Sequence, residues 1–207
     1  MIPVIATSAV AFSIWLAYRL HKNTKLENKQ KESFWERENR ANATIMKPID
    51  DLPYVTLPVA ELPLIELPDD STCKEYIGIL QTLSVQKILN LSGISNTDLK
   101  LTYGAGNLPF LSEYDQNYTV MVRTIQRLAE RYADAEHKKE AAALLEFSVS
   151  TGVDMPSTYK LLRKLYEEEK ALDPSKAAEI DAKLMRLKEA AGLLPDVTRN
   201  LVEKVLE

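Results

Sequence analysis

The segment YTVMVRTIQRLAERYA, residues 118–133, gives the clearest indication of the fold. Its apolar residues recur at intervals of three or four positions: Val122, Ile125, Leu128, Ala129 and Tyr132. This spacing places them on one face of an α-helix, with polar side chains on the opposite face. The segment therefore predicts an amphipathic helix that packs against other helices.

Helical patterns continue on both sides of this segment, and no long β-type alternation interrupts them. Towards the C-terminus they cover residues 138–150, 157–169 and 175–190, and a short last helix opens with Pro195 in its first turn. We therefore predict an all-α fold whose main helical domain spans residues 71–207.

On the N-terminal side, a helix is expected from residue 71 to about Leu91. Asp70 or the serine that follows it can cap this helix, and Gly93 is a natural stop. Residues 95–107 predict a short irregular or one-turn element, with GAG as a tight turn between helices.

A repeat relates two parts of this helical region. A shift of 34 residues superimposes three apolar positions: Ile125 on Tyr159, Leu128 on Leu162 and Tyr132 on Tyr166. The length and pattern resemble the tetratricopeptide repeat, which implies stacked antiparallel helical hairpins. In the second unit Arg163 replaces the small residue Ala129. To match the repeat, the next helix needs a further shift of three residues. With this shift, the residues predicted to face inward are Ala178, Ala182 and Met185.

The resemblance also implies an exposed groove lined by the first helix of each unit. The matching positions are Arg123, Gln126, Glu130, Lys160 and Lys164. These residues form the candidate binding face for a partner protein. The alternative interpretation is an ordinary solvated helix face.

Leu-Pro recurs every five residues in the segment before the domain, residues 49–70. The pairs are Leu52-Pro53, Leu57-Pro58, Leu62-Pro63 and Leu67-Pro68. Proline lacks an amide donor and disfavours helix at the preceding residue, so we predict an extended strap. The leucines are expected to be buried between helices. A proline-rich ligand for a partner domain is the alternative, although PxxP spacing is absent.

Residues 1–20 predict a single transmembrane anchor. No charged residue occurs from Ile2 to Tyr18, and Arg19 begins a basic flank. Such a flank stays in the cytoplasm, so the C-terminal domain is expected on the cytoplasmic side of the cell membrane. A cleaved signal peptide is a weaker interpretation because bulky residues end the apolar run.

Residues 21–48 predict a charged, solvated helical stalk with a contact near Phe34 and Trp35. The whole chain of 207 residues carries a net charge of -4, which argues against nucleic-acid binding. A lone Cys73 cannot form an internal disulfide, as suits a reducing compartment.

The sequence offers no recognisable catalytic, cofactor-binding or metal-binding set. Neither His21 nor His137 has a cysteine or carboxylate at metal-ligand spacing. Cys73 has no evident catalytic helper. A hydrolase-like enzyme with an unrecognised carboxylate site remains an alternative, which two buried carboxylates in a deep pocket would favour.

Several segments resemble an uncharacterised family of membrane-anchored proteins from Gram-positive anaerobes. The resemblance rests on residues 34–38, 52–58, 96–100, 103–104 and 114–115. It implies architecture and location but no activity. With the anchor and the repeat, it leads us to expect a membrane-tethered scaffold for protein–protein interaction. A structural subunit of a membrane complex is a further alternative.

Overall fold

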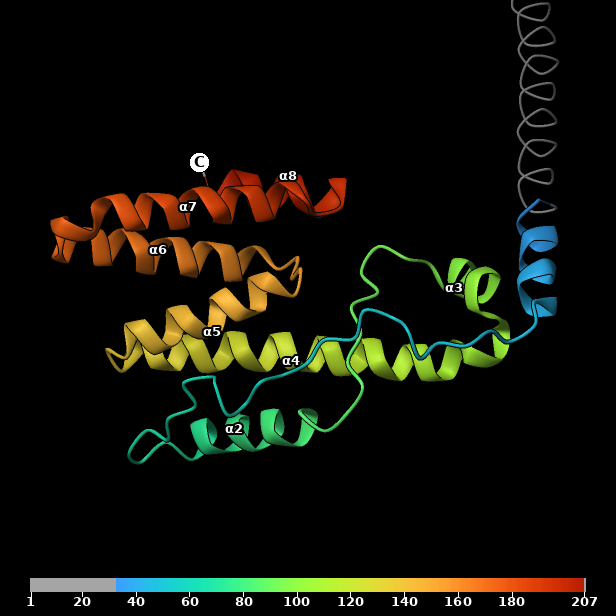
Figure 1. Ribbon diagram of the computed structural model, residues 1–207, viewed down its shortest axis with the longest axis horizontal. Helices are drawn as coiled ribbons and strands as arrows, with labels where there is room; N and C mark the ends of the chain where they lie inside the picture. Colours follow the sequence, from blue (N-terminus) through green and yellow to red (C-terminus); the bar gives the residue numbers. More distant parts are fainter. Residues whose placement is uncertain (1–32, 207) are drawn as a thin grey trace, which may run out of the picture. The chain divides into compact units, whose positions relative to one another are not determined.

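The computed structural model describes residues 33–206 and shows helices, with no strand in that range (Figure 1). The prediction of an all-α fold is therefore confirmed. The predicted anchor and the first part of the stalk lie outside the described residues. Within the described residues, no helix is long and apolar enough to cross a membrane.

The described residues fall into two compact units. Residues 33–49 and 95–108 make the first unit, and residues 50–94 and 109–206 make the second. Each unit has its own internal contacts.

The first unit contains a helix at residues 33–43, α3 (Asn96–Tyr103) and the short 3₁₀ helix η1 (Ala105–Asn107). Glu38 joins the first helix to α3, because it pairs with Lys100 and accepts a hydrogen bond of 2.9 Å from the Thr97 hydroxyl. Two more contacts, between Arg37 and Asp98 and through the buried Ala41, complete the packing.

The stalk is helical over a shorter range than predicted. The helix ends at residue 43 instead of 48, because Pro48 disfavours helix at Lys47. The Lys47 amide instead donates to the Tyr103 carbonyl at 3.0 Å. Gly104 is required beside this segment: its φ is +91°, and a Cβ there would lie 2.5 Å from the Ile45 carbonyl oxygen.

The second unit is a stack of helices (Figure 1). Its elements are α2 (Ser71–Leu83), residues 109–134 of α4 (Leu108–Asp134), α5 (Lys138–Ser150), α6 (Pro156–Leu172), η2 (Pro174–Lys176), α7 (Ala177–Gly192) and α8 (Asp196–Leu206). The helix expected at residues 138–150 is confirmed, and α6 packs against α5, α7 and α8.

Two predicted helix boundaries were wrong. Helix α2 ends at Leu83 rather than near Leu91, because the following backbone bonds to α4 instead of continuing the helix. The Leu89 amide donates to the Tyr114 carbonyl at 3.1 Å, and the Leu91 amide donates to the Asp115 carboxylate at 3.0 Å. Helix α4 begins at Leu108, ten residues before the expected start.

The repeated apolar positions all contribute to the core: Ile125, Leu128, Tyr132, Tyr159, Leu162 and Tyr166 are buried. The expected orientation of α7 was wrong, however. Its outward positions are Ala178, Ala182 and Met185. Its inward positions are Ile180, Leu187 and Ala191, with Leu184 partly buried. These four residues form their own stripe at helical spacing, which sets the buried face of α7.

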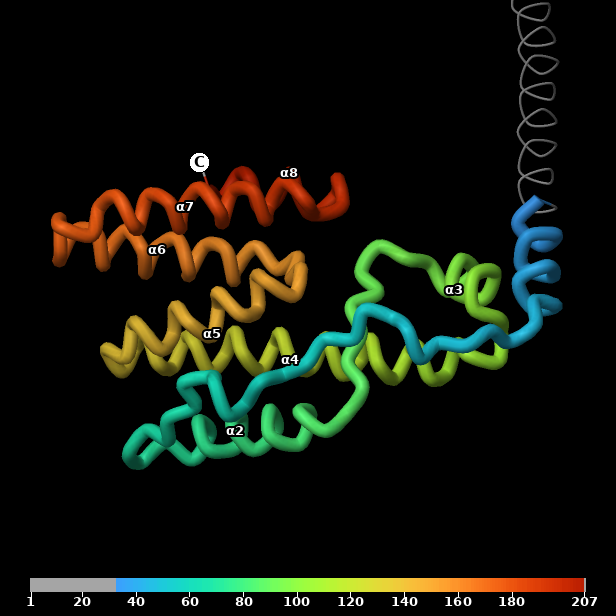
Figure 2. Tube along the Cα trace, viewed as in Figure 1, coloured from blue at the N-terminus to red at the C-terminus, as the bar shows by residue number. Residues whose placement is uncertain are grey.

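The strap contains no helix from residue 50 to 70 and packs against the helices of the second unit, as Figure 2 traces. Leu57 is buried, and Leu62 and Leu67 are partly buried against the core. The Tyr132 hydroxyl fixes the strap twice, because it accepts from the Ile65 amide and donates to the Ile65 carbonyl, each at 2.7 Å.

Candidate functional site

The first surface is a groove between α4 and α6, here called the α4–α6 groove. It encloses about 450 Å³ and closes against Val205 of α8. Its other lining residues come from α4 and α6: Gln126, Glu130, Ser157, Lys160, Leu161, Arg163, Lys164 and Glu167. Four of the five residues predicted for partner binding are thus brought together, while Arg123 is exposed on α4 and is not among the lining residues.

Gln126 holds the two walls of this groove together. Its side chain is buried, and its carbonyl oxygen accepts a hydrogen bond of 2.8 Å from the buried Thr158 hydroxyl. Its amide group donates to Glu130 at 2.7 Å. Because these groups are already hydrogen-bonded within the protein, Gln126 positions the groove rather than offering free polar atoms to a partner.

The cations of the groove differ in how they are paired. Arg163 donates to Glu167 at 2.7 Å and to the Val205 carbonyl at 3.1 Å, so it ties α6 to α8. Lys164 lies 3.6 Å from Glu168. Within the described residues, Lys160 is exposed and has no ion pair. Lys160 is therefore the cation of the groove best placed to meet an outside carboxylate.

A second hollow of about 540 Å³ continues this groove and shares Glu130, Leu161 and Lys164 with it. Its remaining lining residues are Ala133, Asp134, Glu136, Lys138, Leu165 and Glu168. Four carboxylates face two lysines here, which leaves two negative charges, whereas the α4–α6 groove has three cations against two carboxylates. The combined surface therefore has a basic end and an acidic end.

Lys138 partly neutralises the negative charge of the acidic end. Its ammonium lies 3.0 Å from Glu168 and 3.2 Å from Glu136. The hydrogen bond from Lys138 lowers the pKa of Glu168 below its ordinary value, so this carboxylate stays ionised at neutral pH. Asp134 makes no ion pair with any described residue, which leaves it available to a basic group on a ligand.

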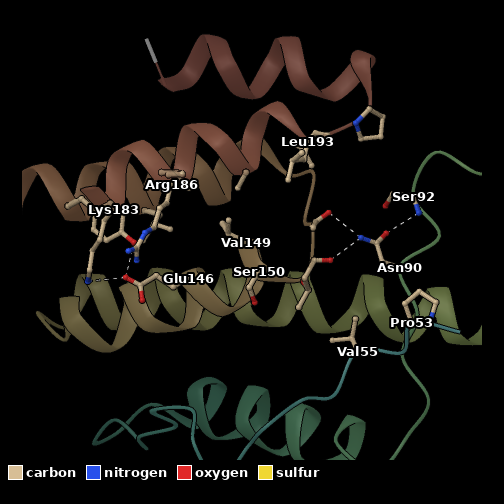
Figure 3. Close-up of a pocket in the computed structure, with 18 residues that line it drawn as sticks. Pro53, Val55, Asn90, Ser92, Glu146, Val149, Ser150, Lys183, Arg186 and Leu193 are labelled. Atoms are coloured by element: carbon tan, nitrogen blue, oxygen red, sulfur yellow. Dashed lines mark hydrogen bonds and ion pairs between the residues drawn. The ribbon is translucent and has the colours of Figure 1, made fainter. Parts of the chain in front are cut away.

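The second surface is a larger cavity beside α5 and α7, here called the α5–α7 cavity (Figure 3). It has a volume of about 910 Å³. Most of its wall is apolar: Pro53, Val55, Val149, Leu162, Leu187, Ala190, Leu193, Leu194 and Pro195. No motif indicated it, because its walls come from the strap, the segment after α2, three helices and the turn before α8.

One end of this cavity is charged. Glu146 accepts a hydrogen bond of 2.7 Å from the Tyr166 hydroxyl and pairs with Lys183 at 3.2 Å (Figure 3). Burial raises the pKa of Tyr166 well above its ordinary value, so the hydroxyl keeps its proton and remains a donor. Arg186 lies at the same end.

The other end is polar but its hydrogen bonds are satisfied internally. The Asn90 amide nitrogen donates to the carbonyls of Thr151 and Gly152, each at 3.1 Å, and its oxygen accepts from the Ser92 amide at 3.0 Å (Figure 3). Both amide hydrogens of Asn90 are therefore used to hold the wall.

Neither surface contains a recognisable catalytic group. None of the carboxylates in the described part of the chain is buried, and no cluster of three or more potential metal ligands occurs there. Cys73 is buried and its thiol lies 3.4 Å from the Ile65 carbonyl oxygen. His137 lies 3.8 Å from Glu140 at the start of α5, while His21 is outside the described residues.

Comparisons of the chain with protein-family models, curated proteins and solved structures found no match.

Proposed function

We propose that this protein is a membrane-tethered scaffold whose α4–α6 groove binds a segment of a partner protein at the cytoplasmic face. The observation that carries the proposal is the exposed, unpaired Lys160 beside the partly exposed Leu161 in a groove of defined shape. Together they offer a point of charge and an apolar contact, the combination that gives peptide sites specificity and affinity.

The charges of the groove define the partner segment. An acidic side chain would lie against Lys160, and a basic side chain would lie against Asp134 in the neighbouring hollow. Between them, an apolar side chain would cover Leu161, which lines both hollows. The preferred partner is therefore a segment with an acidic residue, an apolar residue and a basic residue in that spatial order.

A tetratricopeptide-like role for the stack belongs to the same proposal. The residues matched by the 34-residue shift are buried, and α6 packs against the helices on both sides of it. These features support a repeat-like arrangement in which α4 and α6 present one continuous binding face.

The location rests on the sequence. Residues 1–20 would hold the chain in the membrane, and the basic residues from Arg19 onwards would keep the helical domain in the cytoplasm. The partner would accordingly be a cytoplasmic protein or the cytoplasmic part of a membrane protein.

Site-specific photo-crosslinking in the full-length chain in its own membrane tests this function. A photoreactive residue in place of Ser157, an exposed residue that lines the groove, should crosslink one discrete partner, and the same residue in place of exposed Lys188 on α7 should not. Lys160→Glu should reduce the crosslink from position 157 at least about tenfold, which corresponds to ~1.4 kcal/mol. Lys188→Glu is the matched control. Equal crosslinking from both positions, or no effect of Lys160→Glu, would contradict binding in the groove.

A further inference from the structure

The α5–α7 cavity has the size and lining of a small-molecule site. Its volume of about 910 Å³ falls within the roughly 300–1,000 Å³ typical of such sites. We propose that it binds an aliphatic carboxylate, with the alkyl chain along the apolar wall and the carboxylate at Arg186. This inference is independent of the α4–α6 groove and of the partner proposed for it.

The apolar wall accounts for the alkyl part of the ligand. Leu162, Leu187 and Leu194 are buried side chains of the core that also line the cavity. Val149, Ala190 and the strap residue Val55 extend this wall. An alkyl chain placed here removes apolar area from water on the ligand and on these last three, partly exposed residues, which is favourable at about 25 cal/mol per Å².

The charges of the cavity account for the carboxylate. Its charged lining residues in the described part of the chain are Glu146, Lys183 and Arg186, so one positive charge is left over. Lys183 is engaged with Glu146, whereas Arg186 has no ion pair with any described carboxylate. The guanidinium fork of Arg186 matches the two oxygens of a carboxylate.

The hydrogen bonds favour an alkyl chain over a peptide. An extended peptide needs donors and acceptors for its main chain along the whole site. Two polar side chains of the wall are already used within the protein, because Asn90 holds Thr151 and Gly152 and the Ser150 hydroxyl donates to the Phe147 carbonyl at 2.7 Å. An alkyl chain makes no such demand.

The length of the cavity sets the length of the ligand. The lining residues of α7 begin at Lys183, and the last lining leucines directly follow the helix. The Arg186 guanidinium reaches back beside Glu146 to the Lys183 end of the cavity (Figure 3), so the length is counted from Lys183. At about 1.5 Å per residue, the distance from Lys183 to Leu193 is about 15 Å. An extended alkyl chain advances roughly 1.3 Å per carbon, given C–C bonds of about 1.5 Å, so about 12 carbons fit.

Photo-labelling of the full-length chain in the cells that produce it tests the proposal. The probe is dodecanoate with a diazirine on its alkyl chain, and labelled positions are mapped by mass spectrometry. Labels are expected on wall residues such as Val149, Leu187 and Leu194. The dodecanol probe of equal length should label the cavity at least about tenfold less, because it lacks the charge that Arg186 pairs with.

Two pairs of variants separate the cavity from general lipid labelling. Arg186→Glu should reduce cavity labelling about tenfold, while Lys188→Glu on the same helix leaves it unchanged. Ala190→Trp should fill the cavity and abolish labelling, while Ala182→Trp, on the exposed face of α7, should not. Circular dichroism checks that each variant folds; should Ala190→Trp not fold, Arg186→Glu and the dodecanol probe decide. Absence of cavity labels, equal labelling by dodecanol, or insensitivity to Arg186→Glu would overturn the proposal.

Discussion

The α4–α6 groove and the α5–α7 cavity share helix α6 but differ in chemistry. Lys160 and Lys164 of α6 are one turn apart and line the charged groove. Leu162 and Tyr166 are also one turn apart, and they line the apolar cavity. Positions two residues apart point to nearly opposite sides of a helix, so one helix supplies two different ligand environments. This difference is the reason that we propose different ligands for the two surfaces and expect that each can be disrupted separately.

The groove and the cavity also differ in how they are supported. The groove is held by contacts among helices, such as the hydrogen bond between Thr158 and Gln126. The cavity additionally depends on strap residues Pro53 and Val55, which form part of its wall. Perturbing α6 should therefore affect both surfaces, whereas loosening the strap should affect chiefly the cavity.

Leu162→Ala should have the largest effect and damage both surfaces. This side chain is 1% exposed, and its truncation leaves a hole in the core between α6 and its neighbours. We expect a loss of about 2–5 kcal/mol in the free energy of unfolding, measured by urea denaturation. Leu172→Ala, at a 79% exposed position of the same helix, should change it by less than about 0.5 kcal/mol. Similar losses in both variants would contradict the packing described for α6.

Tyr132→Phe should have an intermediate effect and distinguish the strap from the groove. It removes both hydrogen bonds between the Tyr132 hydroxyl and Ile65 of the strap. The partly buried strap backbone then loses its partners, at a cost of about 1–3 kcal/mol in the free energy of unfolding.

Hydrogen exchange should show faster exchange of the Ile65 amide in Tyr132→Phe, with no change at the α4–α6 contact. Tyr114→Phe is the matched control, since the structure gives its hydroxyl no hydrogen bond to a described residue. Unchanged exchange at Ile65 would show that the strap does not depend on Tyr132.

A smaller effect is expected at alkaline pH, on the cavity side. Burial raises the pKa of Tyr118 to about 12, and its hydroxyl donates to the carbonyl of Thr151, a cavity wall residue, at 3.2 Å. In the unfolded chain a tyrosine loses its proton near pH 10. Between pH 10 and about 12 the unfolded state therefore binds fewer protons, and stability falls as the pH rises.

The contribution of Tyr118 can be isolated by comparing pH 9 with pH 11. Native protein should lose on the order of 1 kcal/mol more than Tyr118→Phe over this interval in urea denaturation. Below pH 9 the pH dependence of the two proteins should be the same. Equal losses between pH 9 and 11 would mean that Tyr118 does not retain its proton in the folded protein.

Helical periodicity predicted most of the fold because the stack buries amphipathic faces. It failed after α2, where Ile88 and Leu91 continue a helical spacing but lie in a segment that is not helical. The conformation of this segment depends on the hydrogen bond from the Leu91 amide to Asp115, a residue 24 positions further along the chain. Tertiary hydrogen bonds of this kind leave no local pattern in the sequence.

The two candidate surfaces were predictable to different degrees. The groove lies between two helices with clear apolar periodicity, so the sequence could place Lys160 and Lys164 on one face of α6. It could not indicate that Gln126 is buried, because that depends on its pairing with Thr158. The cavity was not predictable, since it is assembled from separate segments that only the folded chain brings together.

One measurement tests the independence of the two surfaces most directly. Full-length chain with a photoreactive residue in place of Ser157 is labelled with the dodecanoate probe in the cells that produce it, with and without Arg186→Glu. We predict that Arg186→Glu leaves the protein crosslink at position 157 unchanged and reduces the dodecanoate label about tenfold. Loss of both signals, or of neither, would contradict the account of two surfaces with separate ligands.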